Sequence, residues 1–319
     1  MWYSTSMETN DKNIAIIGLG NQAKAWALNL RDSGYRITIL LRKDSSSFKS
    51  AASLKLDTAV IEDALPQFKN ILLLIPDDQQ APFLEKYGHL LIKNSRVVYA
   101  HGWAIACENI ATTFPQFSHL LLAPKAISSE VRYQFETKGK LAAVYSVEAS
   151  TSIQNDESWL KKLATAIGIT GLYQSSAKDE TYADLFSEQS LLCGLLPYAA
   201  KKSFDLLISK GISKEVAYFE CWLEVKLIAD AMVKMGPESF FQLISPNALL
   251  GAQKAQHLIF DKVYQEKLEM LFREIEDGDF VKFTKSTDID STRKEMIDYW
   301  SNSLLSKVHH EVSDKVISQ

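Results

Sequence analysis

The chain has 319 residues, of which 46% are hydrophobic and 23% charged, and its net charge at neutral pH is −4. These values are ordinary for a globular protein, and the length allows two domains with cores of their own. The balance of charge gives no sign of a nucleic-acid partner, and no run of about 18 apolar residues indicates a membrane span. Cys107, Cys193 and Cys221 lie in apolar sequence, so we expect reduced, buried thiols in a cytoplasmic protein.

The first half of the sequence predicts short buried strands that alternate with helices. We expect strands over residues 13–17, 36–41, 70–75, 97–100, 120–123 and, as the last of the sheet, 141–147, with a helix and a short strand between residues 50 and 64. This alternation is typical of a parallel, doubly wound sheet, in which ligands bind at the carboxyl ends of the strands. The sequence therefore predicts a Rossmann-type α/β domain over residues 1–175.

A glycine-rich turn follows the first predicted strand. Residues 18–23 read Gly-x-Gly-x-x-Ala between a strand and a helix, which is the context in which a pyrophosphate approaches the backbone at a helix N-terminus. The second strand ends at Arg42 and Lys43, followed by three serines at 45–47. An NAD site usually has an acid at this place, whereas a guanidinium with hydroxyl groups suits a 2′-phosphate. We therefore expect NADPH.

The second half of the sequence predicts helices and no strand. Helical patterns cover residues 183–210, 214–234, 247–277 and 292–312. We expect an all-helical domain over residues 176–319, with the boundary placed from the change of pattern alone.

Two pairs of carboxylates lie in this helical half. Asp184 and Glu188 form one pair and Glu220 and Glu224 the other, each four residues apart and each with apolar neighbours. On a helix this spacing puts both acids of a pair on one face. Because ionised carboxylates among apolar residues are costly without a cationic partner, and because Mg²⁺ prefers oxygen ligands, a Mg²⁺ site is one interpretation. Ordinary acids on a helix surface are the other.

With these parts in place, the chain resembles the ketol-acid reductoisomerases, the acetohydroxy-acid isomeroreductases of branched-chain amino-acid biosynthesis. It is most similar to the short form, which has one helical domain per chain. The similarity extends from Ile14 to about Phe283, and the stretches that carry it are residues 27–34, 41–43, 75–77, 100–102, 123–125, 130–132, 184–189, 192–194 and 217–221.

This resemblance implies roles for individual residues. Two Mg²⁺ ions would be held by Asp184 and Glu188 of one subunit and by Glu220 and Glu224 of a partner, in a homodimer with shared active sites or a larger assembly. Ser245 would bind the substrate carboxylate, and His101, Lys125 and Glu224 would be catalytic. The residues implied for the cofactor are Gly18, Leu19, Gly20, Asn21, Gln22, Arg42, Ser45, Ser47, Asp77, Gln80 and Ser128.

The implied reaction converts a 2-hydroxy-2-alkyl-3-keto acid into a 2,3-dihydroxy acid, by alkyl migration and then hydride transfer from NADPH. The chain departs from the family pattern at the third small position of the glycine-rich turn (within residues 21–24), at Trp103, at residues 126–128, at Ser187 and at residues 246–251. Two alternatives therefore stay open at this point. One is an NADP-dependent keto- or hydroxy-acid reductase of a specialised pathway, and the other is a relative that no longer catalyses.

Overall fold

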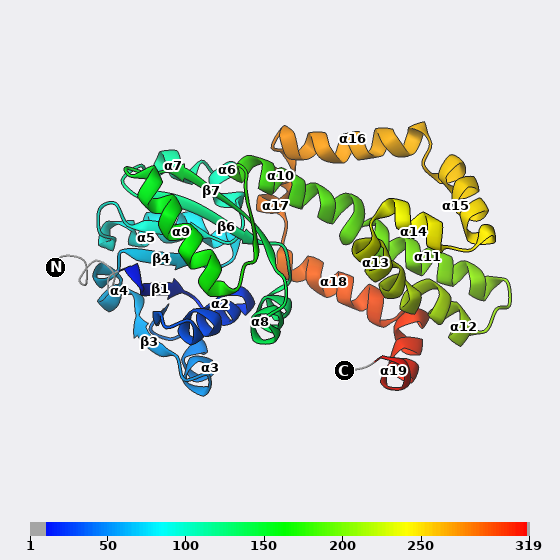
Figure 1. The fold of residues 1–319 in the computed structure, drawn as a ribbon, viewed down its shortest axis with the longest axis horizontal. Coiled ribbons are helices and arrows are strands. Elements are labelled where there is room, and N and C mark those ends of the chain that lie inside the picture. The colour runs from blue at the N-terminus through cyan, green and yellow to red at the C-terminus, as the bar shows by residue number, and fades with distance from the viewer. Residues whose placement is uncertain (1–10, 318–319) are drawn as a thin grey trace. The chain divides into compact units, whose positions relative to one another are not determined.

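The computed structural model describes residues 11–317, and the chain divides into two units, residues 1–183 and 184–319 (Figure 1). The first unit contains the sheet, and the second consists of helices joined by short turns, so the predicted fold class is confirmed. Helix α10 (Ala177–Ser187) carries the chain from the first unit into the second. No helix in the described part of the chain is both long and apolar enough to span a membrane.

The sheet of the first unit has eight strands, in the order β3-β2-β1-β4-β5-β6-β7-β8. Their bounds are β1 (Asn13–Ile17), β2 (Arg36–Leu41), β3 (Asp57–Val60), β4 (Asn70–Leu73), β5 (Arg96–Tyr99), β6 (Ser118–Pro124), β7 (Ala142–Ala149) and β8 (Gly171–Gln174).

The sheet differs from the prediction at its far edge. Strand β7 runs antiparallel to β6: Pro124, at the end of β6, pairs with Ala143, near the start of β7. The sequence analysis expected β7 to be the last strand of the sheet, but β8 follows it. Helix α9 (Ile153–Ile167), which the sequence analysis did not assign, provides the crossover that a parallel β8 requires.

Helices cover both faces of the sheet, and the alternating side chains of β1 show why. Ile14 and Ile16 belong to one core and Ala15 and Ile17 to the other, as the period of two in a strand dictates. The helices that contribute to the first core are α2 (Asn21–Asp32), α3 (Ser47–Ser53), α8 (Ser128–Thr137) and α9. Those of the second are α4 (Ile61–Ala64), α5 (Gln80–Tyr87), α6 (Trp103–Ala106), α7 (Ile110–Thr113) and, through Ala177, the start of α10.

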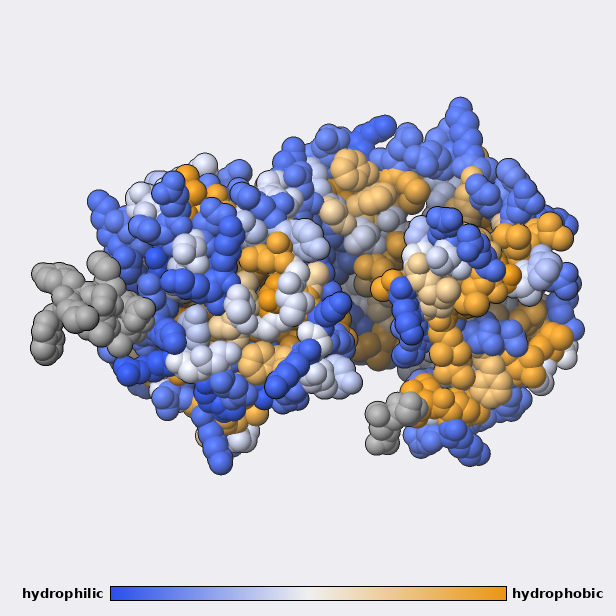
Figure 2. Space-filling model, viewed as in Figure 1, coloured by the Kyte–Doolittle hydropathy of each residue, from blue (hydrophilic) through white to orange (hydrophobic). Residues whose placement is uncertain are grey.

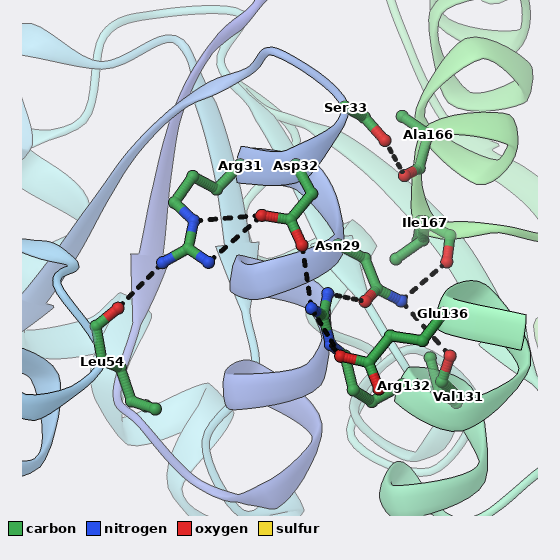
Figure 3. Close-up of polar contacts among 10 residues, drawn as sticks. All are labelled: Asn29, Arg31, Asp32, Ser33, Leu54, Val131, Arg132, Glu136, Ala166 and Ile167. Atoms are coloured by element: carbon green, nitrogen blue, oxygen red, sulfur yellow. Dashed lines mark hydrogen bonds and ion pairs between the residues drawn. The ribbon is translucent and has the colours of Figure 1, made fainter.

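A buried polar network holds α2, α8 and α9 together (Figure 3). Asn29 is fully buried; it donates to the carbonyl oxygens of Val131 (3.3 Å) and Ile167 (2.9 Å) and accepts from Arg132 (2.8 Å). Arg132 also pairs with Asp32 at 2.8 Å. Burial raises the pKa of Asp32, but the two neighbouring arginines outweigh it, so the pKa lies below its ordinary value. Two stretches that carried the resemblance, 27–34 and 130–132, thus fix the packing of helices.

The second unit contains more and shorter helices than the sequence predicted. After α10 come α11 (Leu195–Ser209), α12 (Lys214–Tyr218), α13 (Glu224–Met235), α14 (Pro237–Leu243), α15 (Pro246–Ile259), α16 (Lys262–Glu276), α17 (Asp279–Ser286), α18 (Ile289–Ser301) and α19 (Leu304–Val316). The predicted helix over 247–277 is divided where Asp261 caps α16, and the one over 292–312 where Ser303 caps α19.

The predicted helix over residues 183–210 is interrupted at Gly194. A Cβ atom at this position would overlap the carbonyl oxygen of Gln189, so only glycine fits without a shift of the backbone. Just before it, residues Glu188–Leu192 form a π-helical turn, and a second π turn covers Phe219–Leu223. Such turns are rare and are frequently found at functional sites.

Apolar side chains cover much of the surface of the second unit. Its buried core consists of Phe204, Ala217, Tyr218, Leu305 and Val308. Figure 2 shows hydrophobic surface gathered over the helices of this unit, where Leu250, Leu258 and Val233 are 64%, 75% and 87% exposed. Cys193 is also exposed, and Cys107 and Cys221 are half-buried, so the expectation of three buried thiols was wrong.

Candidate active site

Five of the residues singled out from the sequence follow five neighbouring strands of the first unit. Arg42 follows β2, Gly18 follows β1, Asp77 comes shortly after β4, His101 after β5 and Lys125 after β6. All five strands are parallel, so these residues lie along one edge of the sheet. The strand order reverses between β1 and β4, which is where ligands bind in sheets of this kind.

The glycine-rich turn has the geometry that a bound pyrophosphate needs. Gly18 has a φ of +81°, and a Cβ there would lie 2.8 Å from a methyl carbon of Ile75, so both conformation and space require glycine. Gly20 is the N-cap of α2, and the nearest atom to an added Cβ would be 4.0 Å away. The backbone N–H groups at the start of α2 are therefore open to an anion. Leu19 is buried, Asn21 is exposed and Gln22 is half-buried.

A groove of about 520 Å³ continues from this turn along the ends of β1 and β2. Gly18 and Leu19, together with Arg42, Ser45 and Ser47, line it, as the resemblance implied for cofactor-binding residues. The other lining residues are Ile17, Leu40, Leu41, Ile61, Ile75, Pro76, Gln79, Pro82, Phe83, Lys86 and Tyr87. A groove with apolar walls and a polar end suits a nucleoside that carries a phosphate, so the residues present fit a dinucleotide cofactor.

Two of the expected cofactor residues have other roles or places in the structure. Gln80 is buried and donates to Asp77 (3.0 Å) and to the carbonyl oxygen of Ile75 (3.2 Å), which fixes the turn after β4. Its neighbour Gln79 lines the groove instead. Ser128 is the first residue of α8 and is half-buried.

An acid–base cluster lies at the ends of β5 and β6, around Glu180. Its carboxylate accepts from Lys125 Nζ at 2.6 Å and from the backbone N–H of Gly102 at 2.9 Å. His101 lies between this carboxylate, at 4.0 Å from Nε2, and Asp77, at 3.2 Å from Nδ1. The side chain of Glu180 is only 1% exposed, whereas those of His101 and Lys125 are 20% and 37% exposed. The cluster thus presents an imidazole and an ammonium group to solvent over a buried carboxylate.

Glu180 was not among the residues singled out from the sequence. The close approach of α10 to the turn after β5 brings it here, and this approach depends on glycine at 102, since a Cβ there would lie 2.7 Å from the carbonyl oxygen of Ala177. One signal could have found it: Glu180, Asp184 and Glu188 are successive acids at a spacing of four, which forms a single stripe on a helix.

The four predicted metal ligands lie beside the two π turns. Asp184 is half-buried in the last turn of α10, and Glu188 opens the first π turn. Glu220 lies inside the second π turn, and Glu224 directly follows it. Both π turns contact helix α11. Four carboxylates are a donor set that fits Mg²⁺, but within the described residues of one chain the four do not gather into a group of three or more.

The residue predicted to bind the substrate carboxylate, Ser245, also lies in the second unit. Ser245 caps helix α15, and its oxygen accepts from the backbone N–H of Ala248 at 3.2 Å. A hydroxyl that accepts in this way can still donate its hydrogen to a carboxylate.

Burial, with a smaller contribution from the charge of Glu220, raises the pKa of the Cys221 thiol, so this thiol stays protonated and is a poor nucleophile.

Two family models match the chain. Residues 8–172 match the acetohydroxy acid isomeroreductase NADPH-binding domain, and residues 177–317 match the ketol-acid reductoisomerase C-terminal domain. Among solved structures, an NADH-preferring ketol-acid reductoisomerase from an uncultured archean is 25% identical, with a TM-score of 0.87. That similarity covers 98% of this chain and 96% of the other.

Two more distant structures share the fold. A semialdehyde dehydrogenase NAD-binding protein from Cupriavidus necator, in complex with calcium and NAD, is 16% identical with a TM-score of 0.63, over 83% of this chain and 98% of that one. A 1-pyrroline-5-carboxylate reductase from Streptococcus pyogenes is 18% identical with a TM-score of 0.56, over 82% and 97%. At these identities the likeness concerns the fold alone.

Proposed function

Because this chain belongs to the ketol-acid reductoisomerase family, we propose that it converts a 2-hydroxy-2-alkyl-3-keto acid of the 2-acetolactate type into a 2,3-dihydroxy acid. It is an NAD(P)-dependent oxidoreductase. The observation that carries the proposal is helix α10, which brings Glu180 into contact with Lys125 and His101. Asp184 lies one turn later on the same helix, and Glu188 opens the π turn that follows it.

NADPH and two Mg²⁺ ions are the proposed cofactors. When bound, Mg²⁺ supplies Lewis acidity toward the substrate oxygens, and NADPH supplies the hydride. Asp184 and Glu188, with Glu220 and Glu224, would hold the metal ions. Among the described residues that line the groove, none is acidic, and Arg42 lies there with two serines. This composition favours NADPH over NADH, although one solved relative is NADH-preferring.

The proposed mechanism assigns proton transfers to two side chains, Glu224 and Lys125. Glu224 takes the proton of the substrate hydroxyl as the alkyl group moves from C2 to C3. Glu224 then returns this proton to the oxygen on C3, and Lys125 donates a proton to the oxygen on C2 when C2 receives the hydride. Glu180 holds the ammonium of Lys125 in place at 2.6 Å. His101, held by Asp77, positions the substrate beside the nicotinamide. The O–H of Ser245 would donate to the substrate carboxylate.

We also propose a homodimer with shared active sites. Two observations support it: the exposed apolar surface of the second unit, and the failure of the four carboxylates of one described chain to gather. Exposed apolar side chains that gather on one surface are typical of an interface. Larger assemblies built from such dimers are compatible with the same surface, and the cytoplasmic location remains a prediction from the sequence.

The test of the proposed function is the oxidation of NADPH with 2-acetolactate, with Mg²⁺ and again with EDTA. A parallel reaction uses the isomerised 3-hydroxy-3-methyl-2-oxobutanoate. Turnover of both substrates that depends on Mg²⁺ would support the proposal. Turnover of the second substrate alone would mean that the chain is a reductase without the migration step, and turnover unaffected by EDTA would contradict the metal site.

A first variant separates the roles of metal and cofactor. Asp184→Asn is expected to reduce Mg²⁺-dependent turnover by at least about a hundredfold, since the loss of a residue that only orients a metal ligand already costs about 10–100-fold. The affinity for NADPH should stay within about twofold of wild type. Asp179→Asn removes an exposed carboxylate from the same helix and serves as the control. Equal loss of turnover and NADPH binding in Asp184→Asn would argue against the division of roles.

A further inference from the structure

The groove that would hold the adenosine end of the cofactor contains a second cation that the sequence did not indicate. Lys86, on α5, lines the same groove as Arg42, Ser45 and Ser47. Arg42 and Lys86 reach it from different elements: Arg42 follows β2, and Lys86 lies in the last turn of α5. Among the described lining residues these two carry positive charge and none carries negative charge.

The two cations are close enough to influence each other. The hydrogen bond to Tyr87 is the largest effect and raises the pKa of Lys86; the charge of the Glu62 carboxylate also raises this pKa, and the positive charge of Arg42 lowers it by the smallest contribution. Like charges that share a groove repel, and an anion placed between them converts the repulsion into two attractions. An uncharged ribose hydroxyl cannot do this, whereas a phosphate can.

The Lys86 side chain is also held in a defined place. Its Nζ lies over the ring of Tyr87, 4.7 Å from the ring centroid, a favourable position for a cation. The Tyr87 hydroxyl donates to Glu62 at 3.0 Å. The Glu62 carboxylate acts on Lys86 through its charge but does not line the groove.

We propose that Lys86 is a specificity-determining residue for the 2′-phosphate of NADPH, which it would bind together with Arg42, Ser45 and Ser47. The proposal rests on the proposed use of NADPH and extends it to a residue on a different element. A phosphate held from two sides requires α5 and the loop after β2 to keep their spacing, so the preference for NADPH depends on the packing of α5 as well as on the loop sequence.

The experiment compares Lys86→Gln with the wild-type protein and with Lys49→Gln, which removes an exposed lysine of α3 that does not line the groove. Dissociation constants for NADPH and NADH are measured by tryptophan fluorescence, at low and at high salt. Lys86→Gln is expected to weaken NADPH binding about tenfold, as loss of one charge-assisted contact does, and to leave NADH binding within about twofold. The remaining NADPH affinity should also depend less on salt.

The outcomes separate this inference from the cofactor proposal. A wild-type protein that prefers NADPH, with Lys86→Gln behaving like Lys49→Gln, would overturn the role of Lys86 and leave the use of NADPH intact. A wild-type protein that binds NADH as well as NADPH would overturn the cofactor proposal and the inference with it. Equal weakening of both cofactors in Lys86→Gln would show that Lys86 supports the groove itself and would also overturn the inference.

Discussion

At the scale of single residues, the Lys125–Glu180 pair is unequal in exposure. Glu180 is 1% exposed and Lys125 is 37% exposed, and the two are joined at 2.6 Å. A buried carboxylate needs its partners more than an exposed ammonium does, because water can solvate the latter. The backbone N–H of Gly102 provides the second partner of Glu180. The pair therefore fixes where the ammonium of Lys125 sits, and this placement matters for proton transfer.

We expect Glu180→Gln to lower kcat by at least about tenfold, since a positioned general acid contributes this much or more. The amide keeps the shape and can still accept from Gly102, so cofactor affinity should stay within about twofold. Glu157→Gln, which breaks the Lys161 pair on the surface of α9, is the control and should leave kcat unchanged. If Glu180→Gln loses stability and keeps its full kcat, Glu180 has only a structural role.

A second buried ion pair lies at the opposite, amino end of the strands. Arg96, at the start of β5, donates to Asp156 at 2.6 Å, and Ser150 donates to the same carboxylate at 2.6 Å. Burial raises the pKa of Asp156, but the hydrogen bonds from Ser118, Ser150 and Arg96 outweigh it, so the pKa lies below its ordinary value of 3.8. The folded state therefore binds this proton less readily than the unfolded chain does.

The sign of the pH dependence follows from that shift. The stabilisation is fully present above pH 3.8 and is lost as the pH falls through the lower pKa of the folded state. As the pH is lowered from about 5 to about 3, the free energy of unfolding should fall less in Asp156→Asn than in the wild-type protein. It should also cost about 3 kcal/mol at neutral pH, because Arg96 keeps a buried charge. Denaturant unfolding at several pH values measures both effects; a variant with the wild-type pH profile would contradict the assignment.

At the scale of elements, the backbone around the predicted metal ligands departs from regular helix twice. Glu188 opens one π turn and Glu220 lies inside the other. Gly194 ends the first of these turns, because its N–H bonds to the carbonyl oxygen of Glu188 at 3.0 Å and its missing Cβ makes room for Gln189. The direction of the Glu188 side chain thus depends on a glycine six positions later.

Gly194→Ala is therefore expected to destabilise the protein by about 3 kcal/mol, the cost of forcing a side chain into occupied space, and to lower Mg²⁺-dependent turnover. Gly251→Ala is the matched control. Gly251 lies inside α15 with no atom within 4 Å of an added Cβ, so alanine there should stabilise the helix by about 1 kcal/mol. Thermal unfolding of both variants provides the comparison, and a neutral Gly194→Ala would show that the turn tolerates displacement.

At the scale of the whole molecule, the second unit buries few of its apolar side chains. Val233 and Leu258 are mostly exposed, and the core gathers around Phe204 and Tyr218. A chain of this composition gains stability by covering that surface with another copy, and a shared metal site would make the association obligatory for turnover.

Mixing two inactive variants tests the shared site. Asp184→Asn lacks a ligand of the first pair and Glu220→Gln a ligand of the second. If each site combines the two pairs from different subunits, a mixed dimer has one intact site and one that lacks both ligands. Because about half of the dimers that form at random are mixed, activity should return to about a quarter of wild type. Wild-type protein unfolded and refolded in the same way is the control. If the mixture stays inactive although mixed dimers form, each site belongs to one chain.

Local sequence patterns were sufficient to predict the fold class and several residues at the edge of the sheet. The glycine motif and the alternation of strands and helices predicted the fold class, since each depends on neighbours in sequence. The same patterns indicated His101 and Lys125, because a polar residue directly after a buried strand lies at the edge of the sheet. Helix boundaries in the second half were less accurate, because Asp261 and Ser303 cap new helices inside apparently continuous patterns.

What only the tertiary structure decided concerns contacts between segments far apart in sequence. The antiparallel β7 depends on how the chain returns after α8, and the placement of Glu180 depends on the docking of α10 against Gly102, 78 residues away. Lys86 joins Arg42 in one groove only because α5 packs beside the end of β2. Hydrophobic period and turn chemistry act over a few residues, whereas these placements are set by the packing of whole elements, which no local pattern records.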